Sequence, residues 1–362
     1  NLSKELGKKY EVYECVFNLN QINEYPSNNK LISLNVEGGN NLFSKMVNFF
    51  RRCIALKKIK KQYRIDCTIS HLAGANYVNI LSRDQDKVVL CVHAAKKPDK
   101  NIRGLAGFIE KVLMIPWLYP LADRIVSVSR AVREELISYF GLKGEKIDVI
   151  YNSFDNEGIK AKSIEPIPEK FNIIFNHPVV ITCGRLVLQK NHSGLLNAVS
   201  LALEMTNFKL VIVGDGPLKT ELLNQSEKLN LKVYVEGRDK KISSDYQIYF
   251  LGFQKNPFSF MKLAKVFVLT SDWEGFPLSP CEAMICGLPV ISTDCPTGPR
   301  EILAPDSSLI ENVDLQKAEY AKYGILMPML QPGNENKGDS IWAQALVDLI
   351  ENKKLMEEYG NK

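Results

Sequence analysis

Short apolar runs alternate with amphipathic stretches along most of this 362-residue chain. The runs Lys87–Val92, Val179–Cys183 and Val266–Thr270 are rich in β-branched residues and end at polar or glycine-containing segments, which predicts buried strands. The stretches between such runs carry apolar residues at helical spacing. Strands that alternate with helices form parallel sheets covered by helices, so we predict an α/β protein.

The predicted strands fall into two groups, which indicates two domains. We expect a first domain over residues 1–155, a linker over 156–177, a second domain over 178–340 and a C-terminal helix over 341–362. The linker is charged and contains Pro166 and Pro168. The length of 362 residues, with 45% hydrophobic residues, is sufficient for two hydrophobic cores.

The chain opens with a segment, Asn1–Gly7, that reads as the end of a helix and is followed by a predicted strand, Tyr10–Phe17. Doubly wound nucleotide-binding folds start with a strand and a glycine-rich turn before such a helix. We therefore expect that the first strand and its glycine-rich loop are missing from this sequence.

The most informative stretch is Ser271–Met284, where a predicted strand meets a predicted helix. Ser279 suits the N-cap, and Glu282 falls three residues later, which predicts a capping box. Gly275 in the preceding loop lets a ligand approach the backbone. Amides at a helix N-terminus attract phosphate. Glu274 and Glu282 therefore flank a predicted anion site, unless Glu282 only caps the helix and Glu274 is only a solvated loop residue.

This stretch resembles the signature of retaining glycosyltransferases of family 4, of the bacterial surface-polysaccharide type, which have the GT-B fold. The resemblance implies two Rossmann-like domains that face a cleft, with the C-terminal helix crossing back to the first domain. It also implies that Glu282 holds the ribose hydroxyls of a nucleotide-sugar. Sugar and phosphate binding would fall to Glu274, Gly275, Phe276, Pro277 and Leu278.

Two further motifs of the second domain extend the resemblance. Gly184, Arg185 and Lys190 follow a predicted strand and match the family's Gly-Arg-Leu…Lys motif. The forked donors of arginine and the point charge of lysine suit phosphate, although such residues are usually only solvated. The resemblance implies that they neutralise the diphosphate. Gly252 and Phe253 resemble the family's base-contacting turn.

Another glycine turn, Gly214-Asp215-Gly216, follows the predicted strand Lys209–Val213. It lacks the full Gly-x-Gly-x-x-Gly of a dinucleotide site, and we interpret it as mainly structural.

His93 follows the strand Lys87–Val92, at the carboxyl end where open α/β sheets bind ligands. A single histidine at such a place is as often structural as catalytic. The resemblance implies that it faces the transferred sugar, so His93 and Glu274 are the candidate catalytic residues. His71, at the end of another predicted strand, is a weaker candidate.

We expect neither a metal nor a cofactor. The Asp-x-Asp pair Asp84-Gln85-Asp86 lies at the start of a first-domain strand, opposite the ends where ligands bind, so we expect it to be solvated. Cations and helix amides would instead stabilise the leaving diphosphate. Eight cysteines without a Cys-x-x-Cys pair favour reduced thiols in a cytosol over disulfides or zinc.

A basic amphipathic helix is predicted between Glu37 and Asp66, a stretch with eight basic residues and no acidic one. Apolar residues recur on one side of it at Phe43, Val47, Phe50 and Ile54. Residues 43–64 would bind an anionic membrane surface, or form a solvated face over an ordinary core stripe. Nucleic acid is a poor fit, because no stacking platform accompanies the charge.

No apolar run approaches the roughly 20 residues of a membrane span. We therefore expect a cytoplasmic enzyme, peripheral on the inner face of the membrane. It would move a sugar, with retention of configuration, from a UDP-linked donor to a glycan or lipid-linked acceptor in surface polysaccharide or glycolipid synthesis. The alternatives are a sugar-nucleotide epimerase or phosphorylase of the same fold, a dinucleotide dehydrogenase without its full fingerprint, and a non-catalytic membrane-surface scaffold.

Overall fold

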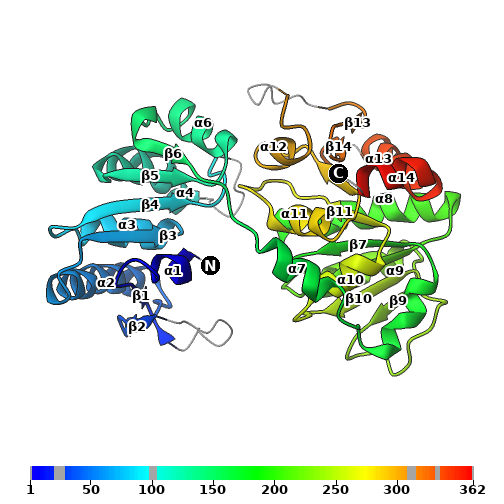
Figure 1. The fold of residues 1–362 in the computed structure, drawn as a ribbon, viewed down its shortest axis with the longest axis horizontal. Helices are drawn as coiled ribbons and strands as arrows, with labels where there is room; N and C mark the ends of the chain where they lie inside the picture. The colour runs from blue at the N-terminus through cyan, green and yellow to red at the C-terminus, as the bar shows by residue number, and fades with distance from the viewer. Residues whose placement is uncertain (1, 20–28, 98–103, 308–314, 331–334, 361–362) are drawn as a thin grey trace. The chain divides into compact units, whose positions relative to one another are not determined.

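The computed structural model describes residues 2–19, 29–97, 104–307, 315–330 and 335–360. Asn1 and residues 361–362, which belong to predicted helices, lie outside these ranges. The chain forms two compact α/β units (Figure 1). The first contains most of the residues up to Ser153, and the second contains Phe154–Lys362 with two short segments from the first half of the chain.

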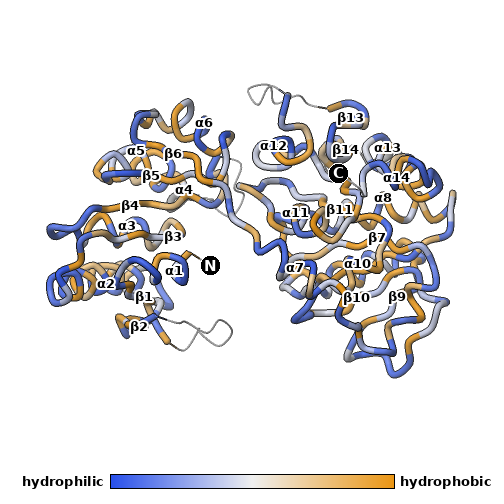
Figure 2. The backbone as a smooth tube through the Cα atoms, in the orientation of Figure 1, coloured by the Kyte–Doolittle hydropathy of each residue, from blue (hydrophilic) through white to orange (hydrophobic). Residues whose placement is uncertain are grey.

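The first unit is built on a parallel four-stranded sheet, as the apolar runs predict. Its strands, in spatial order, are β3 (Cys67–His71), β4 (Lys87–Val92), β5 (Arg124–Ser127) and β6 (Ile147–Val149). A separate parallel pair is formed by β1 (Tyr13–Val16) and β2 (Lys30–Ser33). In Figure 2, β4 is drawn as a largely hydrophobic strand, because it is buried in the middle of the sheet.

Helices connect these strands. They are α1 (Leu2–Leu6), α2 (Leu42–Gln62), α3 (Ala73–Leu81), α4 (Gly104–Ile109), α5 (Ile115–Leu118), α6 (Arg130–Ser138) and the π-helical turn Glu110–Met114 between α4 and α5. The stretch from α4 to Tyr119 is apolar and aromatic. Only part of it is buried, including Ile115 and Tyr119, whereas Phe108 and Trp117 are exposed.

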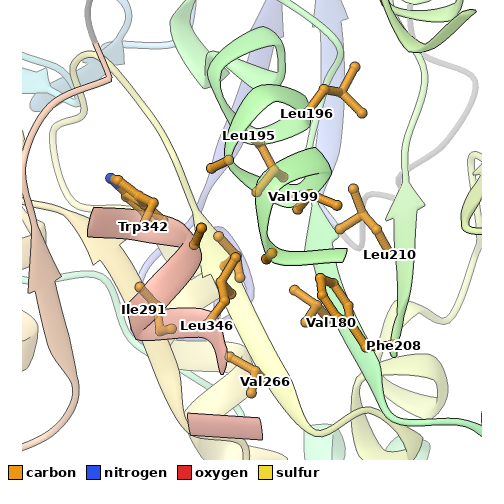
Figure 3. Close-up of a cluster of buried hydrophobic side chains, with 14 of the residues drawn as sticks. Val180, Leu195, Leu196, Val199, Phe208, Leu210, Val266, Ile291, Trp342 and Leu346 are labelled. Atoms are coloured by element: carbon orange, nitrogen blue, oxygen red, sulfur yellow. The ribbon is translucent and has the colours of Figure 1, made fainter. Parts of the chain in front are cut away.

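The second unit is an eight-stranded sheet in which all neighbours are parallel except β13 and β14. Its order is β13 (Glu319–Tyr320), β14 (Ile325–Met327), β12 (Val290–Thr293), β11 (Val266–Leu269), β7 (Val179–Cys183), β8 (Lys209–Val213), β10 (Ile248–Gly252) and β9 (Val233–Val235). The strands of the middle are buried on both faces. In β7, Val180 packs into one hydrophobic cluster (Figure 3), and Val179 and Ile181 pack into the cluster on the other face.

The helices of the second unit cover both faces of its sheet. They are α7 (Asn156–Ser163), α8 (His192–Met205), α9 (Lys219–Lys228), α10 (Pro257–Leu263), α11 (Leu278–Ile285), α12 (Pro299–Leu303), α13 (Glu335–Glu351) and α14 (Lys353–Gly360). Residues 156–177, predicted as a linker, form α7 and a 3-10 helix, Glu169–Asn176. Phe171 and Ile174 are buried in the core of this unit.

The resemblance implied that the C-terminal helix crosses back to the first domain, but the described residues of this segment belong to the second unit. It forms two helices, and Trp342 and Leu346 of α13 pack with Leu195 and Val199 of α8 (Figure 3). The hydroxyl of Tyr359 in α14 donates a hydrogen bond to the carbonyl oxygen of Ala321, at 2.9 Å. These helices therefore stabilise the second unit.

The predicted solvation of the Asp84–Asp86 pair is wrong for Asp86. Its carboxylate lies 2.9 Å from the ammonium of Lys60, and both side chains are buried. The hydroxyl of Thr68 donates a second hydrogen bond to Asp86, and the amide oxygen of Asn79 accepts one from Lys60. A buried ion pair needs such partners to offset its loss of hydration. Asp86 therefore fixes α2 to the sheet.

Helix α2 is present as predicted, but its apolar stripe does not pack into the core. Cys53 and Leu56 provide the buried side of the helix. Phe43, Phe50 and Ile54 are 72%, 56% and 59% exposed. The interpretation of this stripe as an ordinary core face is therefore wrong for these three residues.

Two of the eight cations of α2 and its C-terminal turn are used within the fold. Lys60 is paired with Asp86, and the Arg52 guanidinium lies over the ring of Phe17 and donates to the carbonyl oxygen of Val36. The exposed cations are Lys45, Arg51, Lys57, Lys58, Lys61 and Arg64.

Candidate functional site

The loops that follow β11, β7, β8 and β10 lie side by side, because these four parallel strands are neighbours in the sheet of the second unit. The amide of Gly184, after β7, donates to the carbonyl oxygen of Val213 at 3.0 Å. The amide of Gly214, after β8, donates to the carbonyl oxygen of Gly252 at 2.8 Å. Three of the predicted glycine turns therefore meet at the carboxyl edge of one sheet, where α/β folds bind ligands.

Two of the glycines are required by close backbone contacts. Gly214 has φ of 137°, and a Cβ atom there would lie 2.0 Å from the carbonyl oxygen of Gly184. A Cβ atom at Gly216 would lie 2.4 Å from the carbonyl oxygen of Leu186. The Gly214-Asp215-Gly216 turn is therefore structural, as predicted, because it lets the Gly184–Leu186 loop pack onto it.

Gly252 is different. Its φ of 66° favours glycine, but no atom lies within 4 Å of the position that its Cβ would take. The next residue, Phe253, is exposed. This turn therefore presents its backbone and an aromatic ring on the open side of the same edge.

Lys190 and Glu274 join the loop after β7 to the loop after β11. The Lys190 ammonium lies 2.6 Å from Oε1 of Glu274, and the two side chains are 19% and 8% exposed. The side-chain amide of Gln189 donates to the carbonyl oxygen of Trp273 at 2.8 Å. The two residues that were predicted to bind phosphate and sugar are therefore brought into direct contact.

Further hydrogen bonds fix the backbone of these two loops. The Thr270 hydroxyl donates to the carbonyl oxygen of Lys190 at 2.9 Å, and the Asp272 amide donates to that of Gln189 at 2.8 Å. Asn191 adopts the left-handed region at φ of 45° and donates from its side chain to Asp272. This backbone geometry holds Lys190 against Glu274.

The turn Thr297-Gly298 packs against the loop that contains Glu274 and Gly275. The Thr297 hydroxyl donates to the carbonyl oxygen of Glu274. Gly298 has φ of 94°, and a Cβ atom there would lie 2.5 Å from Cδ of Pro277 and 3.0 Å from the carbonyl oxygen of Gly275. This turn therefore supports the loop from below.

Arg185 occupies the same loop as Lys190, but its side chain has no partner among the described residues. Its side chain is exposed, and it makes no hydrogen bond or ion pair with the residues that the structure describes. Its forked donors are therefore available to an incoming anion.

The predicted capping box at Ser279 and Glu282 is wrong. Helix α11 begins at Leu278 with Pro277 as its N-cap, and no side chain caps it. The extended backbone of Pro277, at φ of −68° and ψ of 128°, starts the helix earlier than expected. Pro280 is tolerated in the first turn, since its missing N–H would have no helical partner there.

This shift changes the interpretation of Glu282, which lies beyond the first turn. Its carboxylate is half-buried, and burial raises its pKa above the ordinary value. Among the described residues it has no hydrogen-bond or ion-pair partner. A carboxylate that is desolvated without a partner costs free energy, which favours a role in ligand binding over capping.

His93 lies in the first unit, at the end of β4, together with His71 at the end of β3. Nδ1 of His71 is 2.8 Å from Nε2 of His93. The sulfur of Cys91 belongs to the same group, and the three ligand atoms all lie within 4.8 Å of one another. Desolvation lowers the pKa of His71 and raises that of Cys91 to about 11. The two histidines were predicted as separate candidates, and Cys91 was missed, although Cys91 and His93 are two residues apart.

His192 was also missed. It is the first residue of α8, directly after Asn191, and it is buried. Burial lowers its pKa to about 4, and its Nδ1 has no hydrogen-bond partner among the described residues. Nothing in the sequence distinguishes this histidine from a solvated one at a helix N-terminus.

Both halves of the chain match known families. Residues 1–157 match the family described as Glycosyltransferase Family 4, and residues 163–322 match Glycosyl transferases group 1. The chain is 30% identical over 352 residues to an uncharacterized glycosyltransferase of Methanocaldococcus jannaschii, which covers 92% of this chain and 82% of the relative.

Another relative carries a specific name. The chain is 28% identical over 355 residues to a Campylobacter jejuni enzyme named N-acetylgalactosamine-N,N'-diacetylbacillosaminyl-diphospho-undecaprenol 4-alpha-N-acetylgalactosaminyltransferase. The match covers 98% of this chain and 82% of that enzyme. Among solved structures, Anabaena HepE in complex with UDP and glucose is similar in fold. The TM-score is 0.65 at 17% identity, over 92% of this chain and 79% of that one.

Proposed function

Because the chain belongs to the glycosyltransferases, with a family 4 domain before a group 1 domain in a GT-B fold, we propose that it transfers a sugar from a UDP-linked donor to a lipid-linked glycan. The product would be a precursor of a cell-surface polysaccharide or glycolipid. The name of the Campylobacter relative supports a diphospho-lipid acceptor, and the complex of the Anabaena protein supports UDP. The observation that carries the proposal is the contact of Lys190 with Glu274 at the carboxyl edge of the second sheet.

The donor binds along this edge. Arg185, whose side chain is exposed and has no partner in the described part of the chain, holds the diphosphate together with the backbone amides at the start of α11. Glu282 accepts hydrogen bonds from the ribose hydroxyls. The open backbone at Gly252 and the exposed ring of Phe253 contact the base.

Glu274 and Lys190 act at the junction between sugar and phosphate. Glu274 accepts hydrogen bonds from the sugar hydroxyls, and Lys190 neutralises charge on the departing phosphate. These groups are held in place before the donor arrives by hydrogen bonds to two loops. Preorganised charge at the atoms where charge develops is the main source of stabilisation in such reactions.

The reaction breaks the bond between the anomeric carbon and the diphosphate and forms a bond from that carbon to an acceptor hydroxyl. The acceptor attacks on the face that the diphosphate leaves, so the anomeric configuration is retained. His93, at the carboxyl edge of the first sheet, faces the transferred sugar. Arg185, Lys190 and the helix amides stabilise the leaving group without a metal ion.

The membrane-binding surface is the exposed side of α2. Residues on this side recur at intervals of three or four along the helix, so they lie on one face. The face begins with Phe43, Met46, Phe50 and Ile54, all exposed, and ends with Lys57, Lys58 and Lys61. Among the described residues, no helix combines the length and the apolar character that a membrane span requires. An exposed apolar stripe beside cations suits shallow binding to an anionic bilayer.

Incubation of the full chain with a panel of nucleotide-sugars tests the proposal. We expect release of nucleoside diphosphate that depends on an added diphospho-lipid glycan, and a matching gain of one sugar on that glycan. Donor conversion to a different nucleotide-sugar would instead identify an epimerase. Dependence on inorganic phosphate would identify a phosphorylase. No turnover of any donor, with unchanged membrane binding, would support the scaffold alternative.

A further inference from the structure

The carboxyl edge of the first sheet gathers three potential metal ligands on one face. His71 is the register partner of Cys91 in the parallel pair of β3 and β4, so their side chains point to the same side of the sheet. His93 follows Cys91 by two residues and is directed to that side as well. The backbone therefore places two imidazoles and a thiol together, independently of any side-chain rotamer.

From this arrangement we propose that His71, Cys91 and His93 form a binding site for a thiophilic divalent cation, with zinc as the best match. Two imidazole nitrogens and one thiolate are a donor set that Zn²⁺ prefers over Mg²⁺ or Ca²⁺. Three protein ligands leave the fourth tetrahedral position open for water or another ligand.

The distances fit with a small adjustment. Ligand atoms around tetrahedral zinc lie about 3.3–3.8 Å apart, given bonds of about 2.0–2.3 Å. The nitrogens of His71 and His93 are 2.8 Å apart, and all three ligand atoms lie within 4.8 Å of one another. A metal ion would replace the hydrogen bond between the rings with two coordinate bonds. Each ring would then carry its proton on the opposite nitrogen, and the Cys91 thiol would release its proton to solvent.

The surroundings hold the ligands in place. The side-chain amide of Asn76 donates to the carbonyl oxygen of Cys91 at 3.2 Å and to the hydroxyl of Tyr119. Asn76, Cys91 and Tyr119 are buried, so the sulfur has little freedom. His71 is exposed and His93 is half-buried, which leaves a path for an ion from solvent. Ligands fixed by such outer contacts bind metal more tightly than flexible ones.

The site has a consequence that rests on the proposed transfer reaction. His93 is the residue proposed to face the transferred sugar, and a bound ion would occupy its Nε2. Zinc would therefore inhibit transfer, and a chelator would restore it. The expectation that catalysis needs no metal is unaffected, since this ion would block the reaction rather than support it.

The direct test measures metal binding by the full chain, without any sugar substrate. Calorimetry with Zn²⁺ is compared with absorption spectroscopy of the Co²⁺ form, in which a thiolate ligand gives an intense charge-transfer band. We expect one ion per chain and a thiolate band. Cys91→Ser and His71→Gln should each weaken binding about tenfold or more, since even outer-shell changes cost about 10–100-fold.

The matched controls are Cys67→Ser, an exposed cysteine on β3, and His177→Gln, a half-buried histidine of the second unit. Both should bind as the unchanged protein does. Cys91 is buried, so weaker zinc binding by Cys91→Ser could result from a loss of stability. His71 is exposed, so we expect His71→Gln to fold normally, and its zinc affinity tests the site directly. Equal binding by His71→Gln and the unchanged protein, or the absence of a thiolate band, would overturn the site. If the unchanged protein binds zinc at this site but its transfer activity is not inhibited, the role of His93 in transfer is refuted instead.

Discussion

Replacing Glu282 by glutamine separates ligand binding from stability at the proposed donor site. The carboxylate is half-buried, it has no partner among the described residues, and it does not cap α11. Burial raises its pKa, so the folded state holds the ionised form less favourably than the unfolded chain does. Its cost to stability is therefore present at neutral pH and disappears as the pH falls below the ordinary value of about 4.5.

Glutamine keeps the size of the side chain and removes the charge. The melting temperature at neutral pH should therefore stay the same or rise. Binding should weaken, because a carboxylate that accepts hydrogen bonds from hydroxyls contributes about 1.5–3 kcal/mol, while a neutral amide contributes about half as much. The expected loss is about 0.75–1.5 kcal/mol, or about four- to twelvefold in the Kd for the nucleoside diphosphate.

Calorimetric titration with UDP and thermal unfolding at neutral pH measure the two quantities. Glu227→Gln provides a matched control, because Glu227 is an exposed glutamate on helix α9 of the same unit. It should change neither quantity. A lower melting temperature with unchanged UDP affinity would show that Glu282 is structural and would refute the reasoning.

The remaining predictions concern other charged groups. Arg185→Ala should weaken UDP binding by about 1.5–3 kcal/mol in calorimetry, since it removes a charge-assisted contact; an unchanged Kd would remove Arg185 from the site. Transfer should persist in excess chelator, and a loss that Mg²⁺ or Mn²⁺ restores would contradict metal-independent catalysis. Changing Lys57, Lys58 and Lys61 to glutamine should reduce co-sedimentation with anionic vesicles at low salt. As a control, the same change at the exposed Lys228, Lys232 and Lys255 should not reduce it. Equal effects of the two sets of changes would exclude α2 as the membrane-binding face. The buried His192 should make the fold less stable as the pH falls from about 6.5 to about 4. In this range its imidazole takes up a proton in the unfolded chain but not in the folded chain. Between these pH values, His192→Gln should reduce the slope of the unfolding free energy against pH by at most about 1.4 kcal/mol per pH unit. An unaltered slope would contradict the conclusion that His192 is buried in its neutral form.

The strands of the second unit could be predicted because they are buried on both faces. A strand such as β7 or β8 is apolar at all but one of its positions, which leaves a nearly continuous apolar run in the sequence. The glycine turns after these strands could be predicted as well, because each of them directly follows an apolar run in the sequence. What the sequence does not show is the spatial order of the strands, which places β11 beside β7. Lys190 and Glu274, 84 residues apart, meet only because of that order.

The side of α2 that packs inward could not be predicted, because the helix carries two apolar stripes. Phe43, Phe50 and Ile54 form the stripe of larger side chains, yet Cys53 and Leu56 form the buried one. Lys60 decides the orientation: its partner Asp86 lies at the start of β4, and an ion pair that excludes water requires Lys60 to face the sheet. A lysine in a basic run gives no sign that it is buried.

At the proposed donor site, we expect the affinity for a diphosphate to depend on few groups. The proposed site contains two cations, Arg185 and Lys190, and two carboxylates, Glu274 and Glu282, so its side chains alone do not make the edge positive. Lys190 is already paired with Glu274 at 2.6 Å, and its charge is partly compensated before any ligand arrives. On the proposed mechanism, Arg185 and the amides at the start of α11 would therefore supply most of the attraction for the diphosphate. Lys190 would become more important as the bond to the sugar breaks, because the additional charge on the leaving phosphate would compete with Glu274 for its ammonium.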